Sequence, residues 1–188
     1  GRYADWLHLR WPGGKEEPLP AVESDFSTAV PGLFVVGELT GVPLLKHAVD
    51  SGSRVVRRVL SDGQECPSDV TPLVIVGAGV SGLSAAVEAR RLGIDFAWYE
   101  AARMLDSVEF YPQGRPIFTA PPELRLDTTL TLPTSPDLDR EGLLSALRQQ
   151  AQERNLQPQS ATLDSVHKEG SILKVQWTDG SHIRAHRV

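Results

Sequence analysis

The sequence contains a single cysteine, Cys66, among its 188 residues. A disulfide framework, a redox-active Cys-x-x-Cys pair and any zinc or iron–sulfur site built from cysteines are therefore excluded within this chain. Cys66 lies in the polar stretch SDGQECPSDV, whose Gly and Pro are typical of a linker. A nucleophilic cysteine would need a base held beside it, so we expect an incidental exposed thiol. No metal site is predicted.

Long apolar runs and clustered basic residues are also missing. No apolar run approaches the ~20 residues that span a bilayer, so no membrane segment is expected. The net charge is −5, and the basic residues do not form the face that nucleic-acid binding requires. The first residues, GRYADWLHLR, show neither an initiator Met nor the order of a signal peptide. We expect a cytoplasmic protein, excised from a longer one, that binds neither nucleic acid nor membrane.

The polar linker, residues 61–71, divides the chain into two parts of different character. In residues 1–60, an irregular start leads to the apolar run Leu33 to Val36, which we expect to be a strand. Gly37 then precedes a helical apolar pattern from about Val42 to Leu60. The first part therefore predicts strand, turn and helix.

Residues 72–188 give a more definite pattern. The run Leu73 to Val76 has no polar alternation, as in a central strand of a parallel sheet, and a helix is expected over Ser81 to Leu92, before the strand DFAWYE. The remaining expected elements are an ordered loop over 101–136, a helix capped by Ser135, and an antiparallel meander over 161–166, 172–177 and 182–188. The fold class is thus α/β, with a parallel sheet and a small antiparallel β-meander.

The chemistry lies in a glycine turn after the first buried strand. Gly77 permits the tight turn, Gly79 lets the backbone approach a pyrophosphate, and Gly82 lets helix and strand pack closely. The N–H groups of Val80, Ser81 and Gly82, at the positive end of the helix dipole, would then receive the phosphates. A glycine-rich turn without a ligand is the alternative reading.

Glu100 narrows the choice of ligand. It ends the next strand, about twenty residues after the glycine turn, where a carboxylate accepts hydrogen bonds from ribose hydroxyls and repels a 2′-phosphate. FAD or NAD is therefore favoured over NADP at this site.

The stretch TAVPGLFVVGELTG resembles the C-terminal flavin motif of the thioredoxin-reductase-like flavoproteins, in which a strand ends in Gly followed by an acid. The resemblance implies that Gly37 and Glu38 lie at FAD, with Glu38 binding its ribitol chain in place of the family's usual Asp. PLLKHAVDSG is similar to the helix that follows. The resemblance places its N-terminal backbone, around Lys46, His47 and Ala48, near the pyrimidine edge of the flavin.

A second resemblance covers the later part. GAGVSGLSAAVEARRLGIDFAWYE followed by VEFYPQGRPIFTAPPELRL is similar to the amino-terminal flavin segment of the bacillithiol disulfide reductase-like group. An aromatic-Pro loop passes beside the flavin in that group, and Tyr111 and Pro112 match it. The two resemblances cover about 28–60 and 72–188.

The order of these segments is inverted relative to the family, which inserts a nicotinamide-binding domain with its own glycine fingerprint between them. No second fingerprint is present here. We expect either a slice across a tandem flavoprotein, with the end of one module joined to the start of the next, or a circularly permuted domain. IRAHRV resembles the entry to a strand that the family places between the first strand and the one ending at Gly37, so we expect a truncated sheet with a gap.

The glycine turn and the resemblance together imply a three-layer Rossmann-type FAD/NAD(P)-binding fold with a small antiparallel β-meander. The resemblance also implies an FAD-dependent oxidoreductase whose parent passes hydride from NAD(P)H through FAD to an unidentified acceptor. The flavin would perform that chemistry, and no side chain in the sequence is a persuasive acid–base catalyst. The alternatives are a non-catalytic FAD- or NAD-binding module and an inactive apo fragment. The expected partners are the dinucleotide and either the rest of the parent flavoprotein or a second copy.

Overall fold

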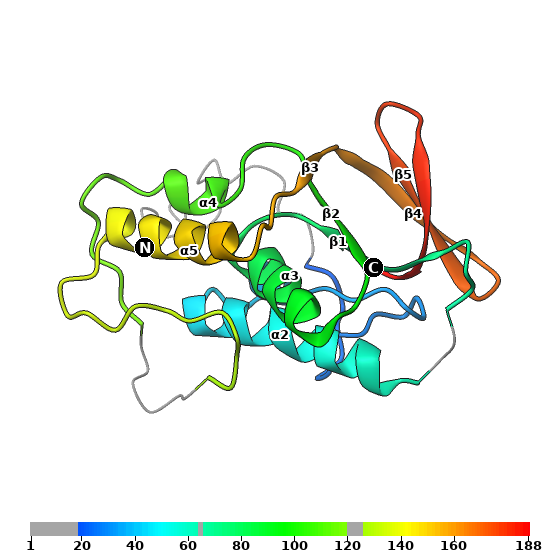
Figure 1. The fold of residues 1–188 in the computed structure, drawn as a ribbon, viewed down its shortest axis with the longest axis horizontal. Coiled ribbons are helices and arrows are strands. Elements are labelled where there is room, and N and C mark those ends of the chain that lie inside the picture. Colours follow the sequence, from blue (N-terminus) through cyan, green and yellow to red (C-terminus); the bar gives the residue numbers. More distant parts are fainter. Residues whose placement is uncertain (1–18, 64–65, 120–125) are drawn as a thin grey trace, which may run out of the picture.

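The protein is described by a computed structural model over residues 19–63, 66–119 and 126–188. A six-stranded sheet has the order β3-β2-β1-β6-β5-β4 and lies on the right in the view of Figure 1. The strands are β1 (Thr71–Val76), β2 (Phe96–Glu100), β3 (Gln159–Ser160), β4 (Leu163–Glu169), β5 (Ile172–Trp177) and β6 (His182–Arg187). The helices are η1 (Gly37–Thr40), α2 (Leu45–Ser61), α3 (Val80–Leu92), α4 (Asp106–Glu109) and α5 (Arg140–Glu153).

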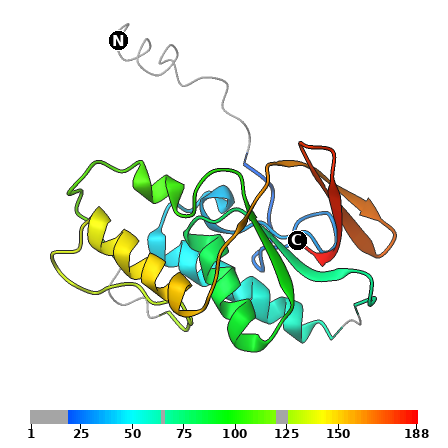
Figure 2. The same cartoon turned by 45° about the horizontal axis from the view of Figure 1, so that its top comes forward.

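The sheet is parallel in one half and antiparallel in the other. β1 pairs in parallel with β2 and with β6, and β2 pairs in parallel with β3. β4, β5 and β6 form the expected antiparallel meander, whose β4–β5 hairpin stands away from the helices in the turned view of Figure 2. The predicted α/β class is confirmed, and β6 joins the meander to the parallel strands in one sheet.

Strand β1 separates two hydrophobic cores. Leu73 and Ile75 belong to a core shared with α2, α3 and α5, whereas Val74 packs on the other face against residues of β5 and β6. This division follows from the period of two in a strand, which turns successive side chains to opposite faces. The absence of polar residues from this part of β1 is explained, because both faces are covered.

Two expectations about local structure are wrong. Leu33 to Val36 is extended but forms no strand, because its hydrogen bonds go to scattered partners: Phe34 N–H donates to Val188 O, and Val35 N–H to Phe26 O. The helix expected after Ser135 begins later, at α5, where the carboxylate of Asp139 accepts a 2.8 Å hydrogen bond from Gly142 N–H. Asp139 is therefore the N-cap.

The region expected to be a loop, 101–136, also holds structure that the sequence did not reveal. The short helix α4 follows Leu105, whose backbone has a φ of 65° and whose side chain is fully buried. Cys66, expected to be exposed, is partly buried, and burial raises the pKa of its thiol. The raised pKa is consistent with an unreactive thiol.

Helices α2 and α3 lie side by side beneath the sheet, and they join the two parts of the chain (Figure 1). A Cβ atom at Gly52 of α2 would lie 2.2 Å from the carbonyl oxygen of Ser81 in α3, so only glycine permits this approach. Nearby, the hydroxyl of Ser84 donates a 2.6 Å hydrogen bond to Val49 O. Residues on opposite sides of the linker thus form one packed unit.

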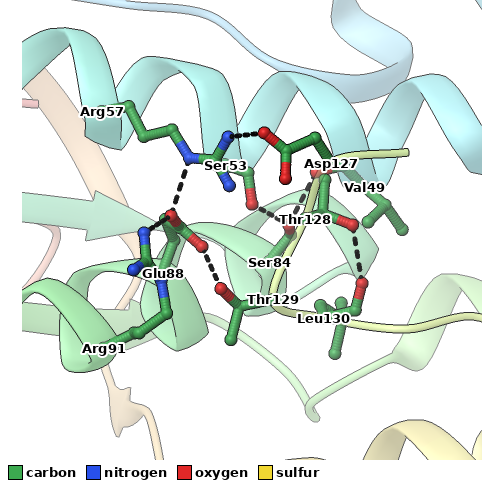
Figure 3. A network of polar contacts seen from close by, with 10 residues as sticks. All are labelled: Val49, Ser53, Arg57, Ser84, Glu88, Arg91, Asp127, Thr128, Thr129 and Leu130. Carbon is green, nitrogen blue, oxygen red and sulfur yellow. Dashed lines mark hydrogen bonds and ion pairs between the residues drawn. The ribbon is translucent and has the colours of Figure 1, made fainter. Parts of the chain in front are cut away.

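A buried carboxylate fixes the same helix pair further along (Figure 3). Glu88 of α3 has no exposed surface, and Arg57 of α2 donates a 2.8 Å hydrogen bond to it. Arg91 and the hydroxyl of Thr129 also donate to Glu88, each at 2.5 Å. Burial alone would raise the pKa of Glu88, but these three donors outweigh it and lower the pKa to about 2.

Candidate dinucleotide site

The glycine turn lies at the carboxyl end of β1, where α3 begins. Gly77 has a φ of 98°, which disfavours any residue with a side chain, and its N–H donates to Tyr99 O of β2 at 2.8 Å. A Cβ atom at Gly82 would lie only 2.0 Å from the carbonyl oxygen of Gly77. The first and third glycines therefore fold the turn and hold helix and strand together, as the sequence predicts.

Gly79 has a different surrounding. A Cβ atom built there would meet nothing nearer than the hydroxyl of Ser107, at 3.8 Å. Gly79 is also the N-cap of α3 without a capping side chain, and the first intrahelical hydrogen bond runs from Leu83 N–H to Gly79 O. The N–H groups of Val80 and Ser81 thus have no acceptor within the helix, and they lie where a phosphate is favoured.

A cavity of about 520 Å³ opens at this helix end. Its volume lies in the usual range for small-molecule sites, about 300–1,000 Å³. Its polar lining comes from Glu38, Ser81, Ser107, Tyr111 and Arg115. Its other lining residues are Leu39, Pro43, Leu44, Leu45, Ala48, Gly79, Val80, Val108, Pro116, Ile117, Phe118 and Leu143. A wall that combines apolar side chains with several polar groups suits a flat aromatic ligand that also carries polar groups.

The N-terminus of α2 faces the same cavity. No side chain caps it at Leu44, and its first intrahelical hydrogen bond runs from Ala48 N–H to Leu44 O. Leu44, Leu45 and Ala48 all line the cavity. Two uncapped helix N-termini, one from each part of the chain, therefore direct their positive dipole ends toward one space.

Gly37 and Glu38 lie at the start of η1, beside the glycine turn. A Cβ atom at Gly37, whose φ is 73°, would lie 2.2 Å from the hydroxyl oxygen of Ser81. The N–H of Gly37 donates a 3.1 Å hydrogen bond to the hydroxyl of Ser51 in α2. This contact holds the chain so that the next residue, Glu38, lines the cavity opposite Gly79.

The aromatic-Pro loop supplies another wall. Tyr111 lines the cavity, and the guanidinium of Arg115 lies over its ring at 4.4 Å from the centroid. Phe118, highly exposed in this structure, lies at the same cavity. A planar ligand in the cavity would cover part of this ring.

Glu100 lies at the end of β2, and its carboxylate is already hydrogen-bonded. One oxygen accepts from Ala78 N–H at 2.5 Å and the other from Ala102 N–H at 2.8 Å. A carboxylate has about four acceptor sites, so it retains capacity for two hydroxyl donors. Glu100 is partly exposed beside the glycine turn, which leaves it accessible to a ribose.

We predict that Glu100→Gln weakens FAD binding by about 1–3 kcal/mol, because an ionised acceptor is lost. The amide cannot accept on both of its heteroatoms, so the bond from Ala78 or Ala102 is also weakened and thermal stability should fall slightly. Calorimetric titration with FAD measures the affinity, and a thermal melt without ligand separates the two effects. Unchanged FAD affinity would mean that Glu100 acts only on the backbone.

Of the predicted site residues, six line the cavity, two hold the turn and four lie elsewhere. Gly79, Val80, Ser81, Glu38, Ala48 and Tyr111 line it, whereas Gly77 and Gly82 shape the turn behind it. Gly37 and Glu100 lie just outside, and the side chain of His47 bonds Thr40 at 2.9 Å instead of facing the cavity. Lys46 likewise is not among the lining residues. The binding role of each of these residues stays a prediction.

The sequence did not reveal several wall residues. Ser107 and Val108 come from the unexpected helix α4, Leu143 from α5, and Ile117 from the proline-rich loop. The loop was recognised through Tyr111 and Pro112, but sequence spacing cannot show which loop side chains turn inward. Leu143 was predicted on the apolar face of its helix, a pattern that does not separate core from cavity wall.

A larger hollow, of about 870 Å³, lies along α4 and α5 and is less suited to an anionic ligand. Its three arginines, Arg103, Arg140 and Arg148, each pair with Glu109 or Glu141. The hydrogen bond from Arg148 and the other nearby arginines hold the pKa of Glu109 below its usual value. Each arginine in the hollow is thus already paired with a carboxylate, and two of the three share Glu109.

Two further findings concern the described residues alone. No group of three or more His, Cys, Asp or Glu side chains among them is arranged to hold a metal ion. No helix in these ranges combines the length and the apolar character needed to cross a bilayer.

Comparison with known proteins gives structural matches only, since no family model and no curated protein matches the chain. The bacillithiol disulfide reductase Bdr from Staphylococcus aureus matches over 63% of this chain and 36% of its own, with a TM-score of 0.52 and 22% identity. The Bacillus cereus enzyme matches over 62% of this chain and 37% of its own, with a TM-score of 0.52 and 21% identity. A flavin-containing monooxygenase from Stenotrophomonas maltophilia matches over 63% of this chain and 37% of its own, with a TM-score of 0.50 and 24% identity.

The chain shares the Rossmann-type fold of these redox enzymes. It spans little more than a third of the length of each of these three solved structures. At these identities the likeness concerns the fold alone, and the predicted resemblance to bacillithiol disulfide reductase-like proteins is confirmed at the level of the fold.

Proposed function

We propose that this chain is the FAD-binding portion of a flavoprotein oxidoreductase. The observation that carries the proposal is the convergence of two uncapped helix N-termini, those of α2 and α3, on one cavity with both apolar and polar walls. A flavin dinucleotide needs positive potential at two separate places, its pyrophosphate and the pyrimidine edge of its ring. The structural neighbours, among them a flavin-containing monooxygenase, support the same ligand class.

The residues present fit the chemistry of FAD. The open space at Gly79, with the N-terminus of α3 behind it, would receive the pyrophosphate. Glu100 would bind the ribose, and Glu38 would accept a hydroxyl of the ribitol chain. Leu44, Tyr111 and the other apolar lining residues would cover the flavin ring.

The bound flavin would supply the ability to accept a hydride and pass on electrons. The chain's own residues would bind, orient and shield it. The backbone at the start of α2 would stabilise negative charge at the pyrimidine edge, since a helix N-terminus carries a partial positive charge. The apolar wall formed with Val108 and Leu143 would keep water from that side.

The identity of the electron donor is the finer part of the proposal. NAD(P)H is the expected donor for the parent protein, and a nicotinamide-binding domain outside this sequence would hold it. The acceptor is not identified. The runner-up function is a non-catalytic FAD- or NAD-binding module, which the same two helix N-termini would serve. The cytoplasmic location stays a prediction.

We further infer that both parts of the chain build one site within a single molecule, as in a permuted domain. Glu38 from the first part and Gly79 from the second line the same cavity, and the fully buried Glu88 pairs with Arg57 across the two parts. Such packing supports an intramolecular site over two half-sites waiting for separate partners. The predicted boundaries, 1–60, 61–71 and 72–188, then mark two segments of one unit.

Titration of the purified protein with FAD tests the proposal. Bound flavin absorbs at about 450 nm, and its fluorescence and sedimentation would report one FAD per monomer. NAD in a parallel titration is the matched control, since it shares the adenosine pyrophosphate and lacks the flavin. Bleaching by NADPH would support hydride acceptance. FAD retention without bleaching would agree with a nicotinamide-binding domain outside this sequence, and the absence of binding by either dinucleotide would refute the proposal.

A further inference from the structure

Helix α2 holds the turn that contains Gly37 and Glu38 at two points. His47 and Ser51 are four residues apart in α2, so their side chains lie on the same face of the helix. The hydroxyl of Ser51 binds the N–H of Gly37, and His47 reaches the carbonyl of Gly37 through the side chain of Thr40. One helix face therefore contacts both ends of the same buried residue.

The direction of each hydrogen bond at Thr40 follows from its single hydroxyl proton. The hydroxyl oxygen of Thr40 lies 2.6 Å from Gly37 O, which can only accept, so Thr40 donates its proton there. The same oxygen lies 2.9 Å from Nε2 of His47. Because the hydroxyl proton is already used, His47 must donate from Nε2–H and Thr40 must accept. The network thus assigns the proton of a neutral His47 to Nε2.

The bond at the other end of Gly37 has an equally defined direction. Gly37 N–H donates at 3.1 Å to the hydroxyl oxygen of Ser51, whose own proton goes to Ala48 O at 3.2 Å. Ser51 has no exposed surface, so water does not compete for these groups. We call the hydrogen bonds among His47, Thr40, Gly37, Ser51 and Ala48 the Gly37 clamp.

The imidazole of His47 also has an aromatic neighbour. The ring of Phe26 packs against it edge-on, with 5.8 Å between the ring centroids and 62° between the planes. Phe26 is buried, and the guanidinium of Arg54, also from α2, lies 5.2 Å from its centroid. An edge-to-face contact favours one orientation of the imidazole plane, which keeps Nε2–H directed at Thr40.

We propose that His47 is a positioning residue, which acts through Thr40 to fix the peptide of Gly37 and thereby to place the carboxylate of Glu38. The side chain of Glu38 has no hydrogen-bond or ion-pair partner among the residues that the structure describes, so its position depends on its backbone. That backbone follows Gly37, whose φ of 73° is open to glycine and costly for other residues.

The consequence for the ligand rests on the proposed function, in which Glu38 accepts a hydroxyl of the FAD ribitol chain. The imidazole itself does not line the cavity, so its effect on the ligand would be indirect. The Gly37 clamp, in contrast, is present without any ligand and can be tested without one.

Nuclear magnetic resonance of the protein without cofactor tests the clamp. At a pH at which the imidazole is neutral, nitrogen-15 spectra should show the proton of His47 on Nε2. His47→Leu should speed amide hydrogen exchange at Gly37 several-fold, because Thr40 loses the donor that orients it. His47→Gln should restore slow exchange, since the amide nitrogen is a donor the same number of bonds from Cβ as Nε2 of histidine.

Titration calorimetry with FAD and with ADP tests the effect on Glu38. His47→Leu should weaken FAD binding about fivefold, the net effect of one hydrogen bond, and His47→Gln should recover most of the loss. ADP carries the pyrophosphate but no ribitol, so its affinity should be equal in all three proteins. In a Glu38→Ala background no carboxylate is left to place, and His47→Leu should then cost nothing further.

His167→Leu is the matched control. Nε2 of His167 lies 3.0 Å from the hydroxyl oxygen of Ser165, but this contact is exposed on β4 and neither residue lines the cavity. Its removal deletes the same kind of imidazole–hydroxyl bond. We expect FAD affinity and exchange at Gly37 to stay at the parent values.

Each of the remaining outcomes decides one part of the proposal. A His47 proton on Nδ1, or equal exchange at Gly37 in the parent and in His47→Leu, would overturn the clamp. Equal FAD affinity in these two proteins, an equal loss of FAD and ADP affinity, or a loss that persists in the Glu38→Ala background would overturn the positioning role. A parent protein that bound no FAD would refute the proposed function and with it the role toward ribitol, whereas the resonance and exchange measurements would still decide the clamp.

Discussion

Replacing Gly79 with alanine should weaken FAD binding at least tenfold, or about 1.4 kcal/mol, and leave the fold intact. The added methyl group would point into open space within the protein, with no atom nearer than 3.8 Å. That space is where the proposed pyrophosphate would approach the start of α3, and a methyl group there would hold the phosphate away from Val80 and Ser81 N–H. Titration calorimetry with FAD and a thermal melt without ligand measure the two effects.

Gly82→Ala is the matched control. It adds the same methyl group one turn along, but there the Cβ atom would lie 2.0 Å from Gly77 O and 3.6 Å from the indole nitrogen of Trp98. We expect the Tm to fall sharply, because helix and strand must separate. Equal FAD affinity for Gly79→Ala and the parent protein would remove the glycine turn from the binding site.

The contrast between these two glycines shows what the sequence can predict. The spacing of Gly77, Gly79 and Gly82 after a buried strand predicts a different role for each glycine. The structure shows the corresponding geometry: a positive φ at Gly77, open space at Gly79 and a close helix–strand approach at Gly82. Short-range rules succeed here because strand, turn and helix are adjacent in the chain. The α3 helix and the β1 and β2 strands lie within a few residues of their predicted bounds for the same reason.

Features that depend on distant partners were harder to predict. Leu33 to Val36 has the composition of a strand, yet strand formation needs neighbours on its edges, and the described chain supplies only single bonds there. The N-cap of α5 was predicted at Ser135 because several cap-forming residues occur close together. Asp139 is the cap because its side-chain carboxylate accepts the hydrogen bond from Gly142 N–H, in the first turn of the helix.

The cavity walls show the same limit. Glu38 and Gly79 could be proposed as site residues from their separate motifs, but the packing of α2 against α3 brings them together, and this contact spans the linker. Ser107 reaches the cavity because the buried Leu105 adopts a positive φ and starts α4, a conformation that its residue type does not suggest. Such a feature is decided by tertiary packing.

The buried carboxylate of Glu88, which joins α2 and α3, predicts that the stability of the fold falls markedly in acid. The pKa of Glu88 is lowered from 4.5 to about 2. A lowered pKa in the folded state means that the stabilisation is fully present above pH 4.5 and is lost as the pH falls toward 2. At 1.36 kcal/mol per unit of pKa, the ionised Glu88 contributes roughly 3 kcal/mol to the free energy of unfolding at neutral pH.

Glu88→Gln should therefore lower the free energy of unfolding by roughly 3 kcal/mol at pH 7, with a deficit that shrinks as the pH falls from 4.5 toward 2. The neutral amide keeps the shape of the side chain but loses the charge that Arg57 and Arg91 pair with. Urea unfolding at several pH values measures the free energy of unfolding of variant and parent. The other carboxylates titrate in both proteins, so their contribution cancels in the difference between the two.

Asp127→Asn is the control, because Asp127 pairs with the same Arg57 at 2.9 Å while its side chain is 99% exposed (Figure 3). Water screens such a pair, so its removal should change stability little at any pH. If Glu88→Gln were as mild as Asp127→Asn, or if its effect were the same at pH 7 and pH 3, the ion pair would not be what holds α2 against α3. The packing at Gly52 and Ser84 would then have to supply that attachment.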